Sequence, residues 1–245
     1  NGSTMSMITT SEAEDAKHSF DKVGYCVCRS VIPTELTDDV TIAVDDVVES
    51  PQDVILVHKE QLEDGTVAPA RIERFVEIPG PLKDACEMAR KVAEKVTGRS
   101  LLTFKDKVNF KYPGGGTFKP HQDSPAYYPH GSWHVSVLLP LTPFNGSNGT
   151  LEVADTLSSA VPMDDLTSIE YEPVMLDVGD ILVFDGLVPH QSGGNFTRSP
   201  RIGMYLTYTD AAEGDVSAAY YAAKAAGIEG MSLNQVDFTG KLVSN

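Results

Sequence analysis

Two hydrophobic periods divide the chain near residue 100. Within residues 80–98, GPLKDACEMARKVAEKVTG, apolar side chains recur every three to four positions, which predicts an amphipathic helix. Residues 11–24 are expected to form another helix, with Ser11 as its N-cap and Glu14 completing a capping box. A third helix is predicted over residues 33–50. The first part of the chain is therefore expected to be mostly helical.

From residue 101 onward the hydrophobic period changes to two. Segments rich in Val, Leu, Phe and Tyr alternate with Gly, Pro and Asn, which predicts strands at 101–113, 133–143, 149–155, 171–186 and 201–210. A short strand is expected at 25–32, and the Ala-rich segment 217–227 is expected to be helical. Helices followed by a run of strands indicate a mainly β domain, a sandwich or barrel with flanking helices on one face.

We expect a single domain over residues 1–245, with 101–210 as its β core. Residues 1–10 are expected to be a tag remnant and a disordered N-terminus. No run of about 18 apolar residues is present, so no membrane-spanning segment is expected. The first residues show no secretory leader, and the three cysteines, an odd number, favour reduced thiols and a cytoplasmic location.

Acidic residues outnumber basic ones by 35 to 19, which gives a formal net charge of −16. Such a surface repels a phosphate backbone, so nucleic acid is not expected as a partner. The expected partner is a small molecule, and nothing in the composition predicts the oligomeric state. An anionic ligand would have to be bound by a few buried cations.

The triplet His121-Gln122-Asp123 contains a candidate metal site. On a strand, residues i and i+2 project to the same face, so His121 and Asp123 could bind one ion side by side. His190, directly after the apolar strand within 171–186, could supply a third ligand. Two histidines and one carboxylate suit non-haem Fe(II) that activates dioxygen. Zinc remains possible by ligand type, although a closed structural zinc site would need a fourth ligand. The alternative is a solvated polar loop.

A candidate co-substrate site lies further along the chain. Arg201, at the start of the last predicted strand, could bind a distal carboxylate in bidentate fashion. Ser192, two residues after His190, could add a hydroxyl to the same carboxylate. The alternative for Arg201 is the end of a strand, paired with a surface acid.

Four motifs, HQD, SNGTLEV, VGDILVFDGLVPHQSG and SPRIGMYLTY, resemble those of the phytanoyl-CoA dioxygenase family of Fe(II)/2-oxoglutarate oxygenases, in the same order and at the same spacing. The resemblance covers residues 101–210 and implies a double-stranded β-helix, a cupin-like jelly roll, with N-terminal helices. It implies iron at His121, Asp123 and His190, and 2-oxoglutarate at Arg201 with Ser192. Such enzymes use dioxygen to oxidise a C–H bond and release succinate and CO2.

Two further segments, FKDKVNFKYPGGGTFKPHQDSPAY and YTDAAEGDVSAAYYAAKAA, resemble a narrower group that includes hydroxylases of 2-(trimethylammonio)ethylphosphonate. In one respect the chain departs from the family. Residues 148–160, NGTLEVADTLSSA, lack the Pro-Gly-Ser-His turn that relatives often have. Related halogenases replace the metal-binding carboxylate with a small residue, so Asp123 favours an oxygenase outcome such as hydroxylation or desaturation.

Candidate anion-binding residues precede the metal motif. Lys107, Asn109 and Lys111 share one face of a strand, where they could bind an anionic substrate group or assist 2-oxoglutarate. Asn109 is the favoured member, assigned to the co-substrate, because solubility alone does not explain an amide between two lysines. A solvent-facing stripe is the alternative. Arg71 and Arg74 are further candidates, with surface ion pairs as their alternative.

Candidate residues for a cationic head group follow the metal motif. The aromatic faces of Tyr127, Tyr128 and Trp133 could enclose a quaternary ammonium by cation–π attraction, or could belong to the core or a lid. The substrate is thus expected to be a quaternary-ammonium phosphonate or a similar zwitterion. Oxidation of another small metabolite, a family member that binds without turnover, and a metal-dependent hydrolase that needs no dioxygen are the alternatives.

Overall fold

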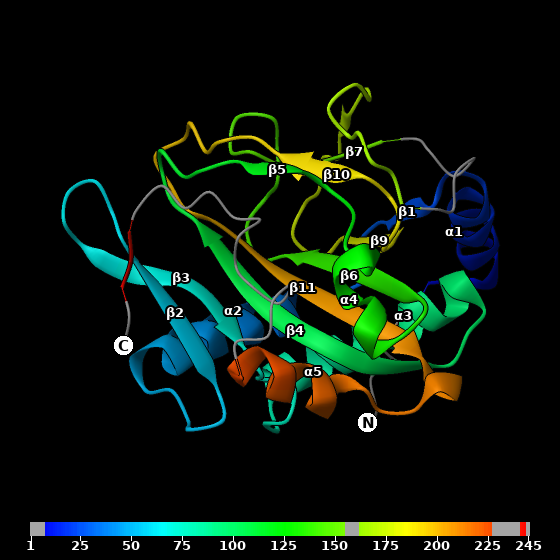
Figure 1. Ribbon diagram of the computed structural model, residues 1–245, viewed down its shortest axis with the longest axis horizontal. Helices are drawn as coiled ribbons and strands as arrows, with labels where there is room; N and C mark the ends of the chain where they lie inside the picture. Colours follow the sequence, from blue (N-terminus) through cyan, green and yellow to red (C-terminus); the bar gives the residue numbers. More distant parts are fainter. Residues whose placement is uncertain (1–7, 155–161, 227–240, 244–245) are drawn as a thin grey trace.

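The computed structural model describes residues 8–154, 162–226 and 241–243. Its helices are α1 (Thr10–Val23), α2 (Thr34–Glu49), α3 (Pro81–Thr97), α4 (Ser124–Tyr127) and α5 (Ser217–Ala225), with 3-10 turns η1 (Tyr128–His130) and η2 (Ala211–Glu213). Two antiparallel sheets form the centre of the molecule (Figure 1).

The larger sheet contains, in spatial order, β1 (Tyr25–Cys28), β9 (Ile181–Asp185), β6 (His134–Pro140), β11 (Arg201–Asp210), β4 (Leu101–Lys111), β3 (Val67–Glu73), β2 (Leu56–Gln61) and β12 (Lys241–Val243). The smaller sheet contains β5 (Phe118–His121), β10 (His190–Ser192), β7 (Leu151–Val153) and β8 (Glu172–Pro173). Two sheets, with α1, α2 and α3 packed on one outer side of the larger sheet, confirm the predicted jelly-roll architecture. Helix α5 packs separately, against Phe104 and Lys105 of β4.

Strand β6 shows how the period of two builds both faces of the large sheet. All of its residues are buried. Val137 and Leu139 pack in the cluster that includes the apolar stripe of α3, whereas Leu138 packs with Leu151 of the small sheet. Alternate side chains of one strand therefore join the helical layer and the space between the sheets.

The helices form largely where the apolar pattern predicts them. On α3 the buried stripe contains Leu82, Cys86, Ala89, Val92 and Val96, and Gly98 ends the helix in the left-handed conformation at φ 69°. Helix α1 starts earlier than expected. Its N-cap is Thr9, which forms the capping box with Glu12, so the assignment of Ser11 and Glu14 was wrong.

The N-terminal prediction is corrected in part by this cap. Thr9 and Thr10, which belong to the segment expected to be disordered, start α1; residues 1–7 lie outside the described residues. The loop whose Pro-Gly-Ser-His turn is missing also lies partly outside them, at 155–161. Strands β2 and β3 were not predicted, and the segment 171–186 contains two strands, β8 and β9, instead of one.

The register of the central strands positions the candidate site residues. Strand β11 pairs with β4 on one side and β6 on the other, so that Arg201 lies opposite Lys111, and Tyr205 lies opposite Lys107. Strand β3 pairs with β4 so that Arg71 lies opposite Asn109. Cationic and amide side chains from separate parts of the sequence therefore meet on neighbouring strands.

Candidate metal centre

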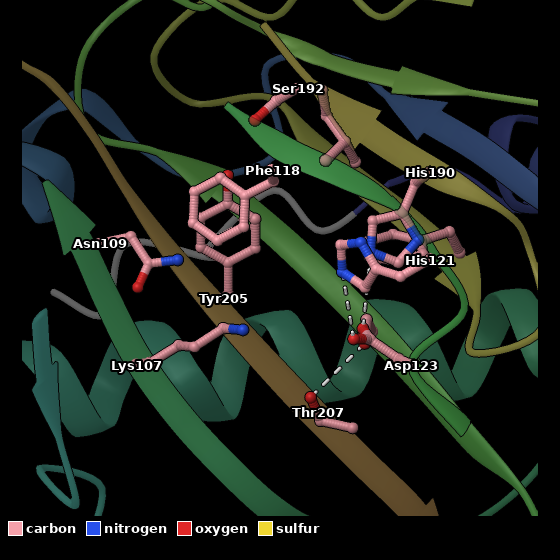
Figure 2. A pocket seen from close by; sticks show the side chains of 12 residues that line it. Lys107, Asn109, Phe118, His121, Asp123, His190, Ser192, Tyr205 and Thr207 are labelled. Carbon is pink, nitrogen blue, oxygen red and sulfur yellow. Dashed lines mark hydrogen bonds and ion pairs between the residues drawn. The ribbon is translucent and has the colours of Figure 1, made fainter. Parts of the chain in front are cut away.

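The three candidate ligands lie together at the edge of the small sheet. His121 ends β5 and His190 begins β10, and the antiparallel register places the two directly opposite each other. Asp123 follows β5 by two residues, at the start of α4. The Nε2 atoms of both histidines lie 3.9 Å from carboxylate oxygens of Asp123 (Figure 2). The predicted ligand atoms all lie within 4.8 Å of one another.

Backbone carbonyls orient both imidazole rings. Nδ1 of His121 lies 2.7 Å from the carbonyl oxygen of Lys119, and Nδ1 of His190 lies 2.9 Å from that of Val188. A carbonyl oxygen only accepts, so each Nδ1 carries the proton and donates it. Each Nε2 then presents its lone pair to Asp123, the arrangement that metal-binding histidines commonly adopt. The hydroxyl of Ser136 donates to Asp123 Oδ2 at 3.1 Å and orients the carboxylate.

The site keeps its groups in the protonation states that ligate a cation. Burial lowers the pKa of His121 to about 4, assisted by repulsion from His190. Burial acts to raise the pKa of Asp123, but attraction by His190, Lys107 and His121 outweighs it and holds this pKa below the usual range. A neutral imidazole beside a carboxylate is ready to bind metal without first losing a proton.

A cavity opens beside the triad. All three candidate ligands line it, together with Lys107, Asn109 and Tyr205 on the facing strands (Figure 2). Within the described residues, no further His, Cys, Asp or Glu joins the three in a metal-binding group. Three protein donors beside a cavity leave positions for other molecules, as a catalytic site requires and a closed structural zinc site does not.

Arg201 is almost fully buried, at 1% exposure. Its guanidinium donates to the carbonyl oxygen of Gly149, lies 3.5 Å from the Tyr205 hydroxyl, and covers the Phe144 ring at 4.4 Å. In the part of the chain that the structure describes, Arg201 pairs with no acid, and its Nε has no hydrogen-bond partner. The alternative of a surface ion pair was therefore wrong.

Lys111 and Ser192 lie beside this arginine. Lys111 is the cross-strand neighbour of Arg201, and its Nζ donates to Ser192 Oγ at 2.7 Å and to the Gly193 carbonyl oxygen. Burial lowers the pKa of Lys111 to about 6, and repulsion from Arg201 adds to the effect. Ser192 also lines the cavity, whereas Arg201 is set behind Tyr205.

The predicted stripe on β4 does not face solvent. Asn109 and Lys111 are buried, and Lys107 lines the cavity, so the solvent-facing alternative was wrong. Arg74 does not reach the cavity. It lies beside Glu77 at 3.4 Å and covers the Tyr221 ring at 5.1 Å, in the surface ion pair that was its alternative.

The structure does not place the three predicted aromatic residues in the cavity lining. Tyr127 packs in a cluster with Phe104 and Tyr220, and Tyr128 is 41% exposed. Trp133 donates its indole N–H to Asp185 and is covered by Arg99 at 4.4 Å. The helical turn of α4 follows Asp123 directly. The three aromatic residues therefore lie near the triad in sequence but do not line its cavity. These aromatic residues do not form the predicted enclosure.

Sequence reasoning missed a buried charge network behind the cavity. It joins β3, β4 and α5 through Arg71, Glu73, Lys105, Tyr220 and Lys224. The alternation of charged and apolar residues along β4 was visible. The partners come from segments far apart in the sequence, so only the strand register reveals them. Of this network, only Arg71 had been considered as an anion candidate.

The comparisons with known proteins give the family. The family model of phytanoyl-CoA dioxygenase (PhyH) matches residues 20–203. The chain therefore belongs to this family, whose members are Fe(II)- and 2-oxoglutarate-dependent oxygenases. This membership confirms the predicted reaction class and the predicted iron and 2-oxoglutarate cofactors.

Among individual proteins, the chain is 32% identical over 195 residues to a methylphosphonate hydroxylase of Gimesia maris, an alignment that covers 75% of this chain and 72% of that one. It is 29% identical over 164 residues to a 2-aminoethylphosphonate dioxygenase of an uncultured bacterium, covering 62% of this chain and 63% of that one. Among solved structures, EctD from S. alaskensis with bound Fe superimposes with a TM-score of 0.65 at 19% identity, over 87% of this chain and 80% of that one.

No helix among the described residues is long and apolar enough to cross a membrane. The three cysteines are buried and unpaired.

Proposed function

We propose that this chain hydroxylates a C–H bond of a small phosphonate, with His121, Asp123 and His190 as ligands of Fe(II). The observation that carries the proposal is the position of this triad in a cavity whose facing wall contains a lysine and an amide. The relatives named as a methylphosphonate hydroxylase and a 2-aminoethylphosphonate dioxygenase support the choice of substrate class.

The residues of the triad fit an iron ion. Two imidazoles and one carboxylate, each oriented by a hydrogen bond, form the donor set of non-haem Fe(II) oxygenases. When bound, iron and 2-oxoglutarate supply the oxidising chemistry, in which dioxygen is consumed, 2-oxoglutarate becomes succinate and CO2, and the substrate gains a hydroxyl group. The part of the protein is to bind and orient the reactants and to exclude water.

Arg201 and Ser192 fit the distal carboxylate of 2-oxoglutarate. A buried guanidinium without an acid partner is costly, and an incoming carboxylate would satisfy it, the free Nε–H included. Lys111 holds Ser192 by a hydrogen bond, and a carboxylate bound there would favour the charged form of this lysine, whose pKa burial and Arg201 lower to about 6. Asn109 was assigned from the sequence to the co-substrate. In this proposal Asn109 instead faces the part of the cavity that binds the substrate.

Apolar side chains limit the space around the triad. Phe118 and Leu151 line the cavity from the small sheet, and Phe184 lines it from β9 of the large sheet. They exclude water from the reacting carbon and leave orientation to the few polar groups. Because Tyr127, Tyr128 and Trp133, the residues predicted to enclose a trimethylammonium head, do not line the cavity, we expect a smaller phosphonate to be the better substrate.

The proposal is tested by succinate release from purified protein with Fe(II), 2-oxoglutarate and a panel of phosphonates. The panel contains methylphosphonate, 2-aminoethylphosphonate and 2-(trimethylammonio)ethylphosphonate, with acetate and β-alanine as carboxylate counterparts. We expect release that needs both Fe(II) and dioxygen and that at least one phosphonate stimulates above the substrate-free rate. Stimulation only by non-phosphonates would contradict the substrate class, and turnover without dioxygen would indicate a hydrolase.

A further inference from the structure

One lysine in the cavity has no partner of its own. Lys107 lines the cavity with the triad, and Figure 2 shows its ammonium directed into the space between Tyr205 and Asp123. Among the described residues it makes no hydrogen bond or ion pair; its nearest specific contact is the Tyr205 ring, 5.4 Å from Nζ. Burial, together with repulsion from Lys105 and Arg71, lowers the pKa of Lys107 to about 7, although Asp123 and Glu73 act in the opposite direction.

A hydrogen bond fixes the orientation of the neighbouring side-chain amide, that of Asn109. Nε of Arg71 donates to Oδ1 of Asn109 at 3.0 Å, across the paired strands β3 and β4. An arginine only donates, so this bond identifies the amide oxygen and leaves the Nδ2 group free. Asn109 lines the cavity, and its NH2 group is thus a donor held ready for an acceptor there.

Behind these two groups, positive charge exceeds negative charge. Arg71, Lys105 and Lys224 surround the fully buried carboxylate of Glu73, which lies 3.4 Å from Arg71 and forms a shorter ion pair with Lys224. Burial acts to raise the pKa of Glu73, but Lys105, Arg71 and Lys224 outweigh it and hold this pKa well below the usual range. One carboxylate cannot neutralise three cations, and the Lys107 amine, about half charged near pH 7, faces the same space. Asp123 also favours the charged forms of Lys105 and Lys107, but its carboxylate belongs to the triad and would be shared with the metal.

Such an excess is unexpected inside a chain of net charge −16. Buried charges are normally paired, because an unpaired charge loses its hydration without compensation. The excess therefore indicates that a ligand with more than one negative charge completes the site. A phosphonate, with three oxygens and up to two negative charges, matches a free ammonium, a free amide and the charge behind them.

We propose that Lys107 and Asn109 bind the phosphonate group of the substrate, with Arg71 positioning Asn109 and Lys105 contributing a second buried charge. This inference rests on the proposed function and deepens it. The anion subsite so defined, Lys107 with Asn109, lies on the opposite wall of the cavity from His121 and His190. A phosphonate bound there would present its carbon toward the triad. Arg201 and Lys111 remain available for 2-oxoglutarate.

Two substitutions test the subsite. Lys107→Met removes the charge and keeps the length of the side chain. Asn109→Asp keeps the acceptor for Arg71 but puts a carboxylate oxygen where the donor was, so the fold should tolerate it while an anion is repelled. Lys107→Arg serves as a charge-retaining variant, and Lys91→Met, on the exposed face of α3, as the matched control.

Affinity is measured by calorimetric titration of methylphosphonate into anaerobic protein loaded with Fe(II) and 2-oxoglutarate, and turnover by succinate release. Loss of a charge-assisted contact should raise both Kd and KM for methylphosphonate roughly 10- to 100-fold in Lys107→Met and Asn109→Asp. Lys107→Arg should retain more affinity than Lys107→Met. The KM for 2-oxoglutarate should change much less than the KM for methylphosphonate in both variants, and Lys91→Met should match the wild type.

The outcomes separate this subsite from the proposed function. If methylphosphonate stimulates the wild type and both variants with similar KM, the subsite is wrong and the function stands. If Lys107→Met raises the KM for 2-oxoglutarate instead, the group holds the co-substrate and the subsite is again wrong. If the wild type releases succinate but neither binds methylphosphonate nor responds to it or to any other phosphonate, both proposals fall.

Discussion

Arg201 carries a charge that the folded protein leaves unpaired among its described residues. It is 1% exposed, donates to one backbone carbonyl and stacks on Phe144. Burial lowers its pKa. A buried charge without a partner destabilises the folded protein, and an apolar residue at this position would avoid that cost. The presence of Arg201 therefore indicates a role in binding a ligand.

Replacing Arg201 by Met should separate function from stability. The KM for 2-oxoglutarate is expected to rise about 10- to 100-fold, because a bidentate charge-assisted contact contributes roughly 1.5–3 kcal/mol. The melting temperature of the apoprotein should stay unchanged or rise, since a buried charge gives way to an apolar chain of similar length. Steady-state kinetics test the expected rise in KM, and thermal denaturation tests the expected melting temperature. An unchanged KM for 2-oxoglutarate would assign the co-substrate to another cation.

Lys107 should take up a proton when a phosphonate binds. Its pKa in the unliganded protein is lowered to about 7, so near pH 8.5 most of it is neutral. A dianion beside it favours the charged form and raises the pKa, so binding draws in a proton at this pH and much less near pH 6, where the lysine is already charged. Calorimetry in buffers of different ionisation enthalpy measures the uptake. Equal uptake by wild type and Lys107→Met near pH 8.5 would contradict the assignment.

The sequence revealed the residues that work through local spacing. His121 and Asp123 follow from the i, i+2 rule, and His190 and Arg201 from their places at strand ends. Arg71 became a partner of Asn109 only through the register of β3 on β4, which no local pattern specifies. Conversely, Trp133 lies near the metal motif in sequence, yet its indole N–H donates to Asp185 and its side chain does not line the cavity.

Helix α5 shows at the scale of an element how the anion subsite is backed. Its Lys224 pairs with Glu73 of β3, and its Tyr220 hydroxyl accepts from Lys105 of β4 at 2.8 Å. Among the elements the structure describes, α5 thus packs over the charge network through polar groups as well as through the aromatic cluster of Phe104 and Tyr127.

Replacing Glu73 by Gln should destabilise this arrangement. The change leaves Arg71, Lys105 and Lys224 without their shared carboxylate, and removing one partner of a buried ion pair costs roughly 3–5 kcal/mol. Urea denaturation measures the loss in unfolding free energy. Glu77→Gln is the control, because its pair with Arg74 is largely exposed, at 61% for Glu77, and such pairs contribute about 0–1 kcal/mol. Equal losses in both variants would show that Glu73 does not hold the network together.

Element prediction succeeded where one long pattern dominated. The stripe of α3 and the 11 residues of β4 are long enough for their periods to be unambiguous. Strands β2 and β3 were missed because charged residues and Pro69 interrupt their apolar pattern. The start of α1 was misplaced by two residues because Thr9 and Ser11 are both good caps, and tertiary contacts decide between them.

At the scale of the whole molecule, the jelly-roll arrangement followed from helices preceding a run of strands. The pairing of β11 between β4 and β6 did not, because long-range register depends on the complete core. The acidic composition had a clearer consequence. A net charge of −16 repels an anionic substrate at long range, and the cavity attracts it at short range.

Salt should therefore favour the encounter with a phosphonate. Raising the ionic strength from about 0.01 to 0.15 M shortens the Debye length from about 30 to 8 Å, which screens the surface and affects the buried cations less. We expect kcat/KM for methylphosphonate to rise severalfold over this range. Steady-state kinetics in two different salts check the effect and exclude specific ion inhibition. A steep fall with salt in both would show that attraction dominates at long range.

The central claim is that the His121–Asp123–His190 site couples 2-oxoglutarate consumption to the hydroxylation of a phosphonate. The most direct measurement is the stoichiometry of succinate and oxidised phosphonate, followed together by mass spectrometry and phosphorus NMR in reactions with Fe(II) and dioxygen. A ratio near one is expected for at least one phosphonate, and neither product is expected with Asp123→Ala, because one ligand of three is lost. Succinate formed without any oxidised phosphonate across the panel, or oxidised phosphonate formed by Asp123→Ala at the wild-type rate, would contradict it.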